Sequence, residues 1–145
     1  MKTYKYKLNP SKAQKSIFES WISSARFLYN LALSERIMVY EMRKKSVSKY
    51  DQYNQLPELK KLYPWLGEVY SDTIQEVLDR LDKTYQNFFR GTGFPKFSKK
   101  GEYNSFTFKR SFKVNEKTIK LPKIGEVRYY NSRTILGTPK TATII

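Results

Sequence analysis

Residues 71–89 read SDTIQEVLDRLDKTYQNFF and carry the strongest helical signal in the chain. Their apolar residues recur at steps of four, three, four and three, which places them on one face of an α-helix. Ser71 is a favourable N-cap and Asp72 suits the first turn. We therefore expect an amphipathic helix that starts at Ser71 and ends near residues 89–91.

More helical signal lies on the N-terminal side of this stretch. Ser11 and Gln14 have the spacing of a capping box. Apolar residues at helical spacing follow them, so we expect two helices, or one bent helix, that end near residues 43–45.

Residues 46–67 are less regular. Residues 48–51 resemble a helix entrance, and Pro57 favours a helix start over a helix interior. Residues 64–67, which read PWLG, predict a turn that buries its tryptophan.

Alternating residues predict strands at both ends of the chain. Tyr4, Tyr6 and Leu8 alternate with lysines, which is the pattern of a half-buried strand. After a basic loop of residues 93–101, further strands are expected at residues 105–108, 112–114, 118–121, 127–129 and 141–145. The order strand, helices, strands predicts an α+β fold with helices inserted into a small β domain.

The chain is strongly basic, and its charge is uneven. Its 145 residues include 28 Lys plus Arg and 13 Asp plus Glu, a net charge of +15. Residues 1–89 hold 15 basic and 10 acidic residues, whereas residues 90–145 hold 13 basic and 3 acidic residues. Such an excess points to a polyanionic partner, usually nucleic acid, whose contacts we expect mainly in the second stretch.

The composition excludes several other classes of site. The chain has no Cys and no His, which excludes disulfides, Cys-based zinc sites and histidine acid–base chemistry. Residues 1–10 have no apolar signal-peptide core, and no stretch approaches the length of a membrane span. We therefore expect a cytoplasmic, nucleoid-associated protein without a membrane partner.

Three segments, in this order, resemble one protein family. They are residues 24–30 (SARFLYN), residues 93–97 with 105–107 (GFPKF and SFT), and residues 121–125 (LPKIG). Together they resemble the N-terminal part of TnpB (OrfB) proteins, which accompany insertion-sequence transposons and are related to type V CRISPR nucleases. The resemblance covers nearly all of this chain and less than half of a typical family member.

The resemblance implies a β-barrel wedge domain, formed by residues 1–9 and 92–145, with a helical recognition domain inserted at residues 10–91. It also implies double-stranded DNA and a guide RNA as partners, because family members read a short motif beside the target while the guide reads the rest. The nuclease half, with its Mg²⁺ and Zn²⁺, follows these domains in the family. We expect neither cofactors nor catalytic residues in this chain, and no cleavage by it alone.

The resemblance carries the motif-binding role onto six residues of this sequence. They are Lys49, Tyr53, Ser71, Asp72, Gln75 and Thr107. Glutamine pairs well with adenine, a threonine methyl with thymine, and a helix N-terminus with phosphate. Capping alone also accounts for Ser71 and Asp72, and a solvated surface accounts for Lys49 and Tyr53.

Six basic residues form a candidate track for nucleic-acid phosphates. They are Lys96, Lys99, Lys100, Lys109, Arg110 and Lys113. A charge run is often only a solvated face, but the concentration of charge in residues 90–145 favours phosphate contacts. Six contacts on duplex DNA predict a log–log salt slope of roughly −5.

Other prominent side chains are interpreted as packing or solubilising groups without a binding role. Six aromatic residues have core-like spacings, namely Trp21, Phe27, Tyr29, Trp65, Phe88 and Phe89. Asp79 and Asp82 lack partners at metal-ligand spacing, so we interpret them as solubilising charges. If Phe106 and Phe108 face the core, Thr107 between them faces outward.

Two alternatives to a guided-nuclease fragment stay open. One is a stand-alone DNA-binding repressor or architectural protein that uses the same surface without RNA. The other is the binding half of a split nuclease, for which a separate nuclease-domain chain supplies catalysis. A defined RNA that co-purifies with the chain would favour the guided fragment over the repressor.

Overall fold

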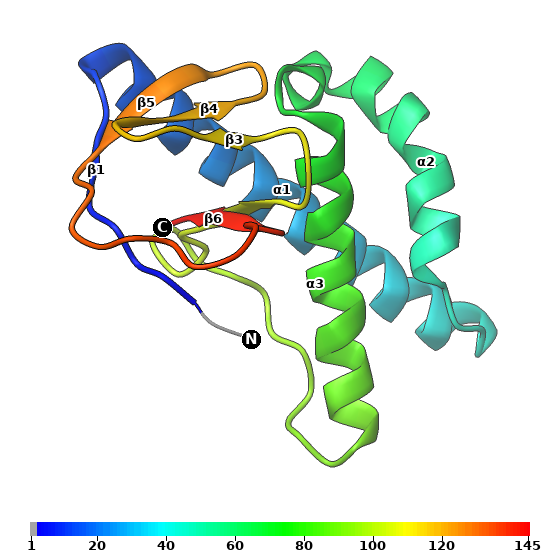
Figure 1. Cartoon of the computed structure of the whole chain (residues 1–145). Helices are drawn as coiled ribbons and strands as arrows, with labels where there is room; N and C mark the ends of the chain where they lie inside the picture. The colour runs from blue at the N-terminus through cyan, green and yellow to red at the C-terminus, as the bar shows by residue number, and fades with distance from the viewer. Residues whose placement is uncertain (1–2) are drawn as a thin grey trace.

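The computed structural model describes residues 3–145 as three α-helices, one 3₁₀ helix and six short strands (Figure 1). The helical elements are α1 (Lys12–Arg43), α2 (Lys49–Leu62), the 3₁₀ helix (Pro64–Glu68) and α3 (Ser71–Phe89). The strands are β1 (Leu8–Asn9), β2 (Phe106–Phe108), β3 (Lys113–Val114), β4 (Thr118–Leu121), β5 (Gly125–Tyr129) and β6 (Ala142–Ile144). The predicted α+β class is confirmed.

A capping box starts α1, as the sequence predicts. The Ser11 hydroxyl accepts from the Gln14 backbone N–H at 3.2 Å, and the Gln14 side chain accepts from the Ser11 N–H at 3.0 Å. The helix then runs without interruption for 32 residues and ends at Lys44, whose φ of 54° lies in the left-handed region. The two-helix alternative is therefore wrong for this segment.

The second helix also begins at a capping box, formed by Ser48 and Asp51. Pro57 lies inside α2, so the prediction that it starts a helix is wrong. The start is set earlier, because the Ser48 hydroxyl and the Asp51 carboxylate satisfy each other's backbone N–H groups. The expected turn after α2 is the 3₁₀ helix, but it buries Leu66 completely and leaves Trp65 38% exposed.

The strong signal at residues 71–89 gives α3, which ends at Phe89 as expected. Ser71 is the first helical residue, and Tyr70 precedes it as N-cap without a side-chain cap bond. The prediction that Ser71 caps the helix is therefore wrong by one position. The apolar face of α3 buries Ile74 and Leu81 completely, and the opposite face is free to carry polar groups.

The strands form two antiparallel sheets, one in the order β1-β5-β4-β3 and the other of β2 and β6. Leu8 pairs with Tyr129, so the first strand joins strands that follow the helices. Within residues 3–145 the sheets do not close into a barrel. The predicted strand is shorter than expected, because Tyr4 and Tyr6 lie outside β1. Their hydroxyls bond the Arg133 carbonyl and the Leu136 N–H.

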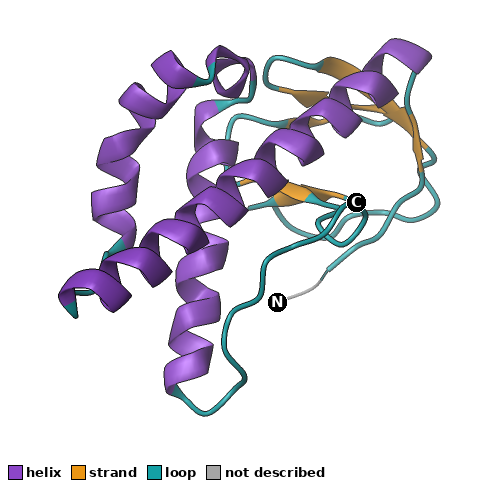
Figure 2. Cartoon of the chain, turned by 180° about the vertical axis from the view of Figure 1, so that it is seen from behind, coloured by secondary structure: helices purple, strands orange, loops and turns teal. Residues whose placement is uncertain are grey.

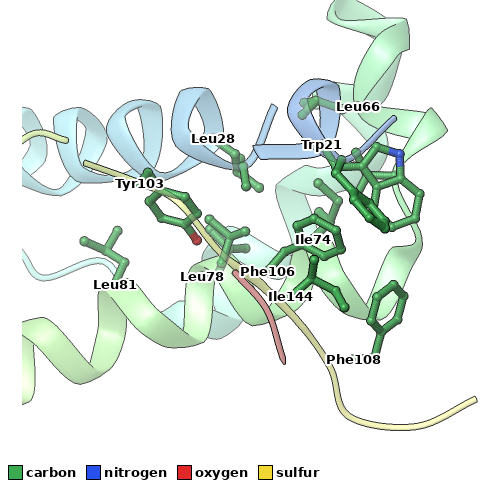
Figure 3. Close-up of a cluster of buried hydrophobic side chains, with 14 of the residues drawn as sticks. Trp21, Leu28, Leu66, Ile74, Leu78, Leu81, Tyr103, Phe106, Phe108 and Ile144 are labelled. Carbon is green, nitrogen blue, oxygen red and sulfur yellow. The ribbon is translucent and has the colours of Figure 1, made fainter. Parts of the chain in front are cut away.

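One hydrophobic core joins the β2–β6 sheet to the helices (Figure 3). Phe106 and Phe108 are completely buried, as the alternation predicts, and their rings lie 5.5 and 6.0 Å from that of Trp21 on α1. Ile144 on β6 closes the same cluster. The outer edge of β2 is thereby fixed against α3, with Thr107 turned away from the core.

Candidate nucleic-acid interface

The polar face of α3 carries three side chains at helical spacing, Asp72, Gln75 and Asp79. Asp72 pairs with Arg110, which follows β2, at 2.9 Å. Asp79 accepts from the Lys109 ammonium and from the Tyr53 hydroxyl of α2. Two segments that are distant in sequence, α2 and the end of β2, therefore meet at α3.

The charges at this surface hold one another in place. Burial raises the pKa of Asp79, but the hydrogen bonds from Lys109 and Tyr53 outweigh it and leave the pKa below its ordinary value of 3.8. Burial, and then the bond to Asp79, raises the pKa of Tyr53, so its hydroxyl stays protonated and donates. The Asp79 carboxylate is thus ionised at neutral pH and clamps α2 to the end of β2.

Lys49 belongs to the same surface. It is the first residue of α2, its ammonium lies 5.5 Å from the centre of the Tyr50 ring, and its charge also lowers the pKa of Asp79. Gln75 is exposed. We call this set the α2–α3–β2 surface; its members are Lys49, Tyr53, Asp72, Gln75, Asp79, Lys109 and Arg110.

Two further residues with a predicted motif-binding role, Ser71 and Thr107, are not members of the α2–α3–β2 surface. Ser71 is exposed on the first turn of α3. The Thr107 hydroxyl accepts from the Arg80 guanidinium at 3.0 Å and lies 2.9 Å from the Thr143 hydroxyl on β6. Both bonds are internal to the protein, so they occupy most of the hydrogen-bonding capacity of the Thr107 hydroxyl.

Arg80 joins α3 to β2. Its guanidinium donates to Glu76 at 2.7 Å, to the Ser105 carbonyl at 3.0 Å and to Thr107. Burial raises the pKa of Glu76 above 4.5 and that of Tyr103, whose ring lies 5.3 Å from the guanidinium, to about 12. Sequence reasoning missed Arg80, although its spacing of four from Glu76 indicates a helical ion pair.

The six residues of the predicted phosphate track lie on different elements of the fold. Lys109 and Arg110 belong to the α2–α3–β2 surface, whereas Lys96, Lys99 and Lys100 lie on the loop of residues 90–105, which returns from the end of α3 to β2 (Figure 2). Lys113 is an exposed residue of β3. Each of the six predicted phosphate-binding roles stays a prediction.

A hollow of about 450 Å³ lies between this loop and α3. Its wall combines aromatic, cationic and neutral polar groups with one carboxylate. The lining residues are Tyr29, Arg80, Lys83, Thr84, Asn87, Lys96, Phe97, Ser98, Glu102 and Tyr103. Asn30 fixes the loop by two bonds, because its amide accepts from the Ser98 N–H at 2.8 Å and donates to the Ser98 carbonyl at 2.9 Å.

Three structural assignments made from the sequence are wrong. Phe89 is 75% exposed because it ends α3, beyond the core. Asp79 bonds Tyr53 and Lys109, and Asp82 pairs with the buried Arg36 at 3.4 Å, so neither is merely a solubilising charge. A search for local spacing cannot find a partner that is distant in sequence.

Neither a metal cluster nor a membrane helix is found in the part of the chain that the structure describes. Residues 3–145 contain no group of three or more His, Cys, Asp or Glu side chains placed to hold a metal ion. No helix among them combines the length and apolar character needed to cross a membrane.

Residues 1–45 match the OrfB/IS605 family described as a helix-turn-helix domain. In this chain the described part of that segment contains β1 and the single continuous helix α1, which extends to Arg43. A helix-turn-helix places its second helix in the major groove, and residues 3–45 hold no second helix. The match supports nucleic-acid binding.

The chain is also 30% identical, over 99% of its length, to the putative RNA-guided DNA endonuclease InsQ of Escherichia coli (strain K12). It spans about 37% of the length of that relative. The predicted resemblance to OrfB/TnpB-type proteins is confirmed by both comparisons. Together they relate the chain to DNA-binding, transposon-associated proteins and to an RNA-guided nuclease.

Proposed function

We propose that this chain is the nucleic-acid-recognition portion of an RNA-guided DNA endonuclease, and that it binds guide RNA and a short DNA motif beside the target. In this proposal residues 10–91 are the recognition domain, and the two open sheets belong to the wedge domain of residues 1–9 and 92–145. Catalysis and its Mg²⁺ and Zn²⁺ belong to a nuclease portion outside these residues, in keeping with the part of InsQ that the chain matches.

One observation carries the proposal: the Asp79 carboxylate bonds Tyr53 from α2 and Lys109 from the end of β2. Tyr53, to which the resemblance gave a motif-binding role, and Lys109 of the predicted phosphate track are thereby held at α3, one helical turn from the exposed Gln75. The neutral amide of Gln75 is suited to the two hydrogen-bonding positions that adenine shows in the major groove. Lys109 and Arg110 flank it and are held ready for phosphate oxygens.

In this arrangement the centre of the surface contacts bases and its β2 side contacts phosphates. Asp72 and Asp79 would repel a phosphate if they were free, but each is occupied by a cation. The centre of the surface is therefore nearly neutral, which favours base contact, while its β2 side offers donors to the DNA backbone. The Thr107 methyl, at the edge of this surface, is suited to the methyl group of thymine.

The test is a selection of bound sequences from a randomised duplex. The native chain should enrich one short motif, and Gln75→Ala should lose the preference at one base pair by about tenfold, because a good bidentate contact discriminates by about 1–3 kcal/mol. Gln86→Ala is the matched control, since Gln86 is also an exposed glutamine of α3 but lies three turns further along. Equal motifs for the native chain and Gln75→Ala would overturn motif reading by Gln75.

Guide-RNA binding is tested separately. The chain is purified without nuclease treatment, and the RNA that accompanies it is sequenced. One defined RNA species is expected. A random mixture of cellular RNA, or none, would contradict the guide-RNA part of the proposal while leaving the DNA-motif part to the duplex selection.

A further inference from the structure

We propose that the hollow between α3 and the loop of residues 90–105 binds an unpaired nucleotide of a single-stranded nucleic acid, with its base stacked on Phe97. This site is separate from the α2–α3–β2 surface. It rests on the proposed function in one respect, that the chain binds nucleic acid at all. Its own evidence is the combination of an exposed aromatic side chain, polar groups that line the hollow and exposed lysines.

Phe97 offers a free aromatic face. The ring is 53% exposed although it lines the hollow, and among residues 3–145 it forms no aromatic pair. The neighbouring Phe94 is different, because its ring is anchored edge-on against Phe88 at 5.0 Å and Tyr85 at 6.0 Å. Both side chains are about half exposed, at 49% for Phe94 and 53% for Phe97, but only the Phe94 ring is packed against other rings among residues 3–145.

The wall of the hollow supplies partners for a base and for its phosphate. The Asn87 amide and the Thr84 hydroxyl are neutral hydrogen-bonding groups, and Lys83 and Lys96 add charge. The one carboxylate, Glu102, accepts from the Lys99 backbone N–H at 2.8 Å, which turns it toward its own loop. A volume of about 450 Å³ lies within the range of about 300–1,000 Å³ typical of small-ligand sites.

Lysines continue the cationic character beyond the hollow. Lys96, Lys99 and Lys100 are exposed, and within residues 3–145 none has a carboxylate within 4.0 Å. Exposed rings interleaved with unpaired cations are the pattern by which proteins hold single strands, since bases stack on rings while cations follow the backbone. A duplex keeps its base faces covered, so it cannot use the Phe97 ring.

The experiment compares Phe97→Leu with the native chain on three probes: an oligo-dT single strand, an oligo-U RNA and a DNA duplex. Phe97→Leu keeps an apolar side chain but removes the stacking face. Affinity for the single strands should fall about tenfold, and affinity for the duplex should not change. Whether the RNA or the DNA strand binds more tightly identifies which strand the site takes.

Phe89→Leu is the matched control, because Phe89 is 75% exposed at the end of α3 and does not line the hollow. It should leave all three affinities unchanged. Equal losses for Phe97→Leu and Phe89→Leu, or an equal loss by Phe97→Leu on single strands and duplex, would overturn the stacking site. Both variants are exposed substitutions, and an unchanged thermal transition confirms that each is folded.

The two proposals fail separately. If the duplex selection finds no motif but Phe97→Leu loses single-strand affinity, the stacking site stands and motif reading falls. If the motif depends on Gln75 but Phe97→Leu binds single strands as the native chain does, the stacking site falls and the proposed function stands.

Discussion

The α2–α3–β2 surface and the loop of residues 90–105 are both basic, but they hold their cations in different ways. On the first, Arg110 pairs with Asp72 and Lys109 with Asp79. On the second, Lys96, Lys99 and Lys100 have no acidic partner within the described residues. Cations fixed by carboxylates keep their geometry and set register, whereas free lysines attract any phosphate chain.

This difference suggests a division of labour. A surface that is almost neutral at its centre gains little from nonspecific attraction, so its contacts can discriminate between bases. A loop of unpaired lysines and exposed rings tolerates any sequence, because every base has a face that stacks. Excess charge alone, which the sequence shows plainly, does not distinguish these two arrangements.

The largest effect is expected from a substitution in the core that supports both regions. Phe106→Ala should lower the free energy of unfolding by about 3–5 kcal/mol, because its ring is completely buried against Trp21. Urea unfolding measures this loss. Affinity for the duplex and affinity for single strands should weaken together. If either affinity were unchanged, the two surfaces would not depend on one common core.

The next effect concerns Arg80, which lies between the regions: it lines the hollow and also bonds Thr107. Arg80→Met should destabilise the chain by about 2 kcal/mol, since the buried Glu76 carboxylate loses its partner. Adding Glu76→Gln should restore part of that loss in urea unfolding. If the double variant lost the full sum of both single losses, the Arg80–Glu76 pair would not be the cause.

A smaller effect depends on pH. The pKa of Asp79 is lowered in the fold from its ordinary value of 3.8, so its contribution is complete above that value and is lost as pH falls through the lower folded value. Asp79→Asn should cost about 1 kcal/mol at neutral pH and clearly less at the lowest pH at which the native chain stays folded. Unfolding curves at the two pH values measure the difference, and an equal cost at both would show that ionisation of Asp79 is not what stabilises the clamp.

The smallest effect separates the cations of the two regions. Lys99→Ala with Lys100→Ala should flatten the log–log salt slope for single strands by about 1.4, at about 0.7 for each lost phosphate contact. The same pair should leave the duplex motif unchanged. Binding titrations across salt concentrations measure the slope, and an unaltered slope would remove both lysines from the footprint.

The sequence predicted the positions of the helices and strands better than it predicted the contacts between them. The capping box at Ser11, the helix entrance at residues 48–51 and the alternation around Thr107 are local signals, and the structure confirms them. Closure of the sheets, the partners of Asp79 and the exposure of Trp65 depend on contacts between distant segments. No local pattern encodes such contacts.

The same limit applies to the candidate site. Resemblance supplied the residue set, including Gln75 and Tyr53, but gave no reason for them to meet. The fold supplies the reason, since Asp79 bonds groups from α2 and from the end of β2. The Thr107 hydroxyl shows the opposite outcome, because it bonds Arg80 and Thr143 within the protein, which the resemblance did not indicate.

Amide NMR titration tests the separation of the two surfaces most directly. With a duplex that carries the selected motif, shifts should concentrate at residues 49–53, 72–79 and 107–110. With a single strand they should concentrate at residues 83–87 and 94–103. Two distinct sets of shifted amides are the result that we expect; the same amides responding to both ligands, or shifts scattered over the outer side of α1, would contradict it.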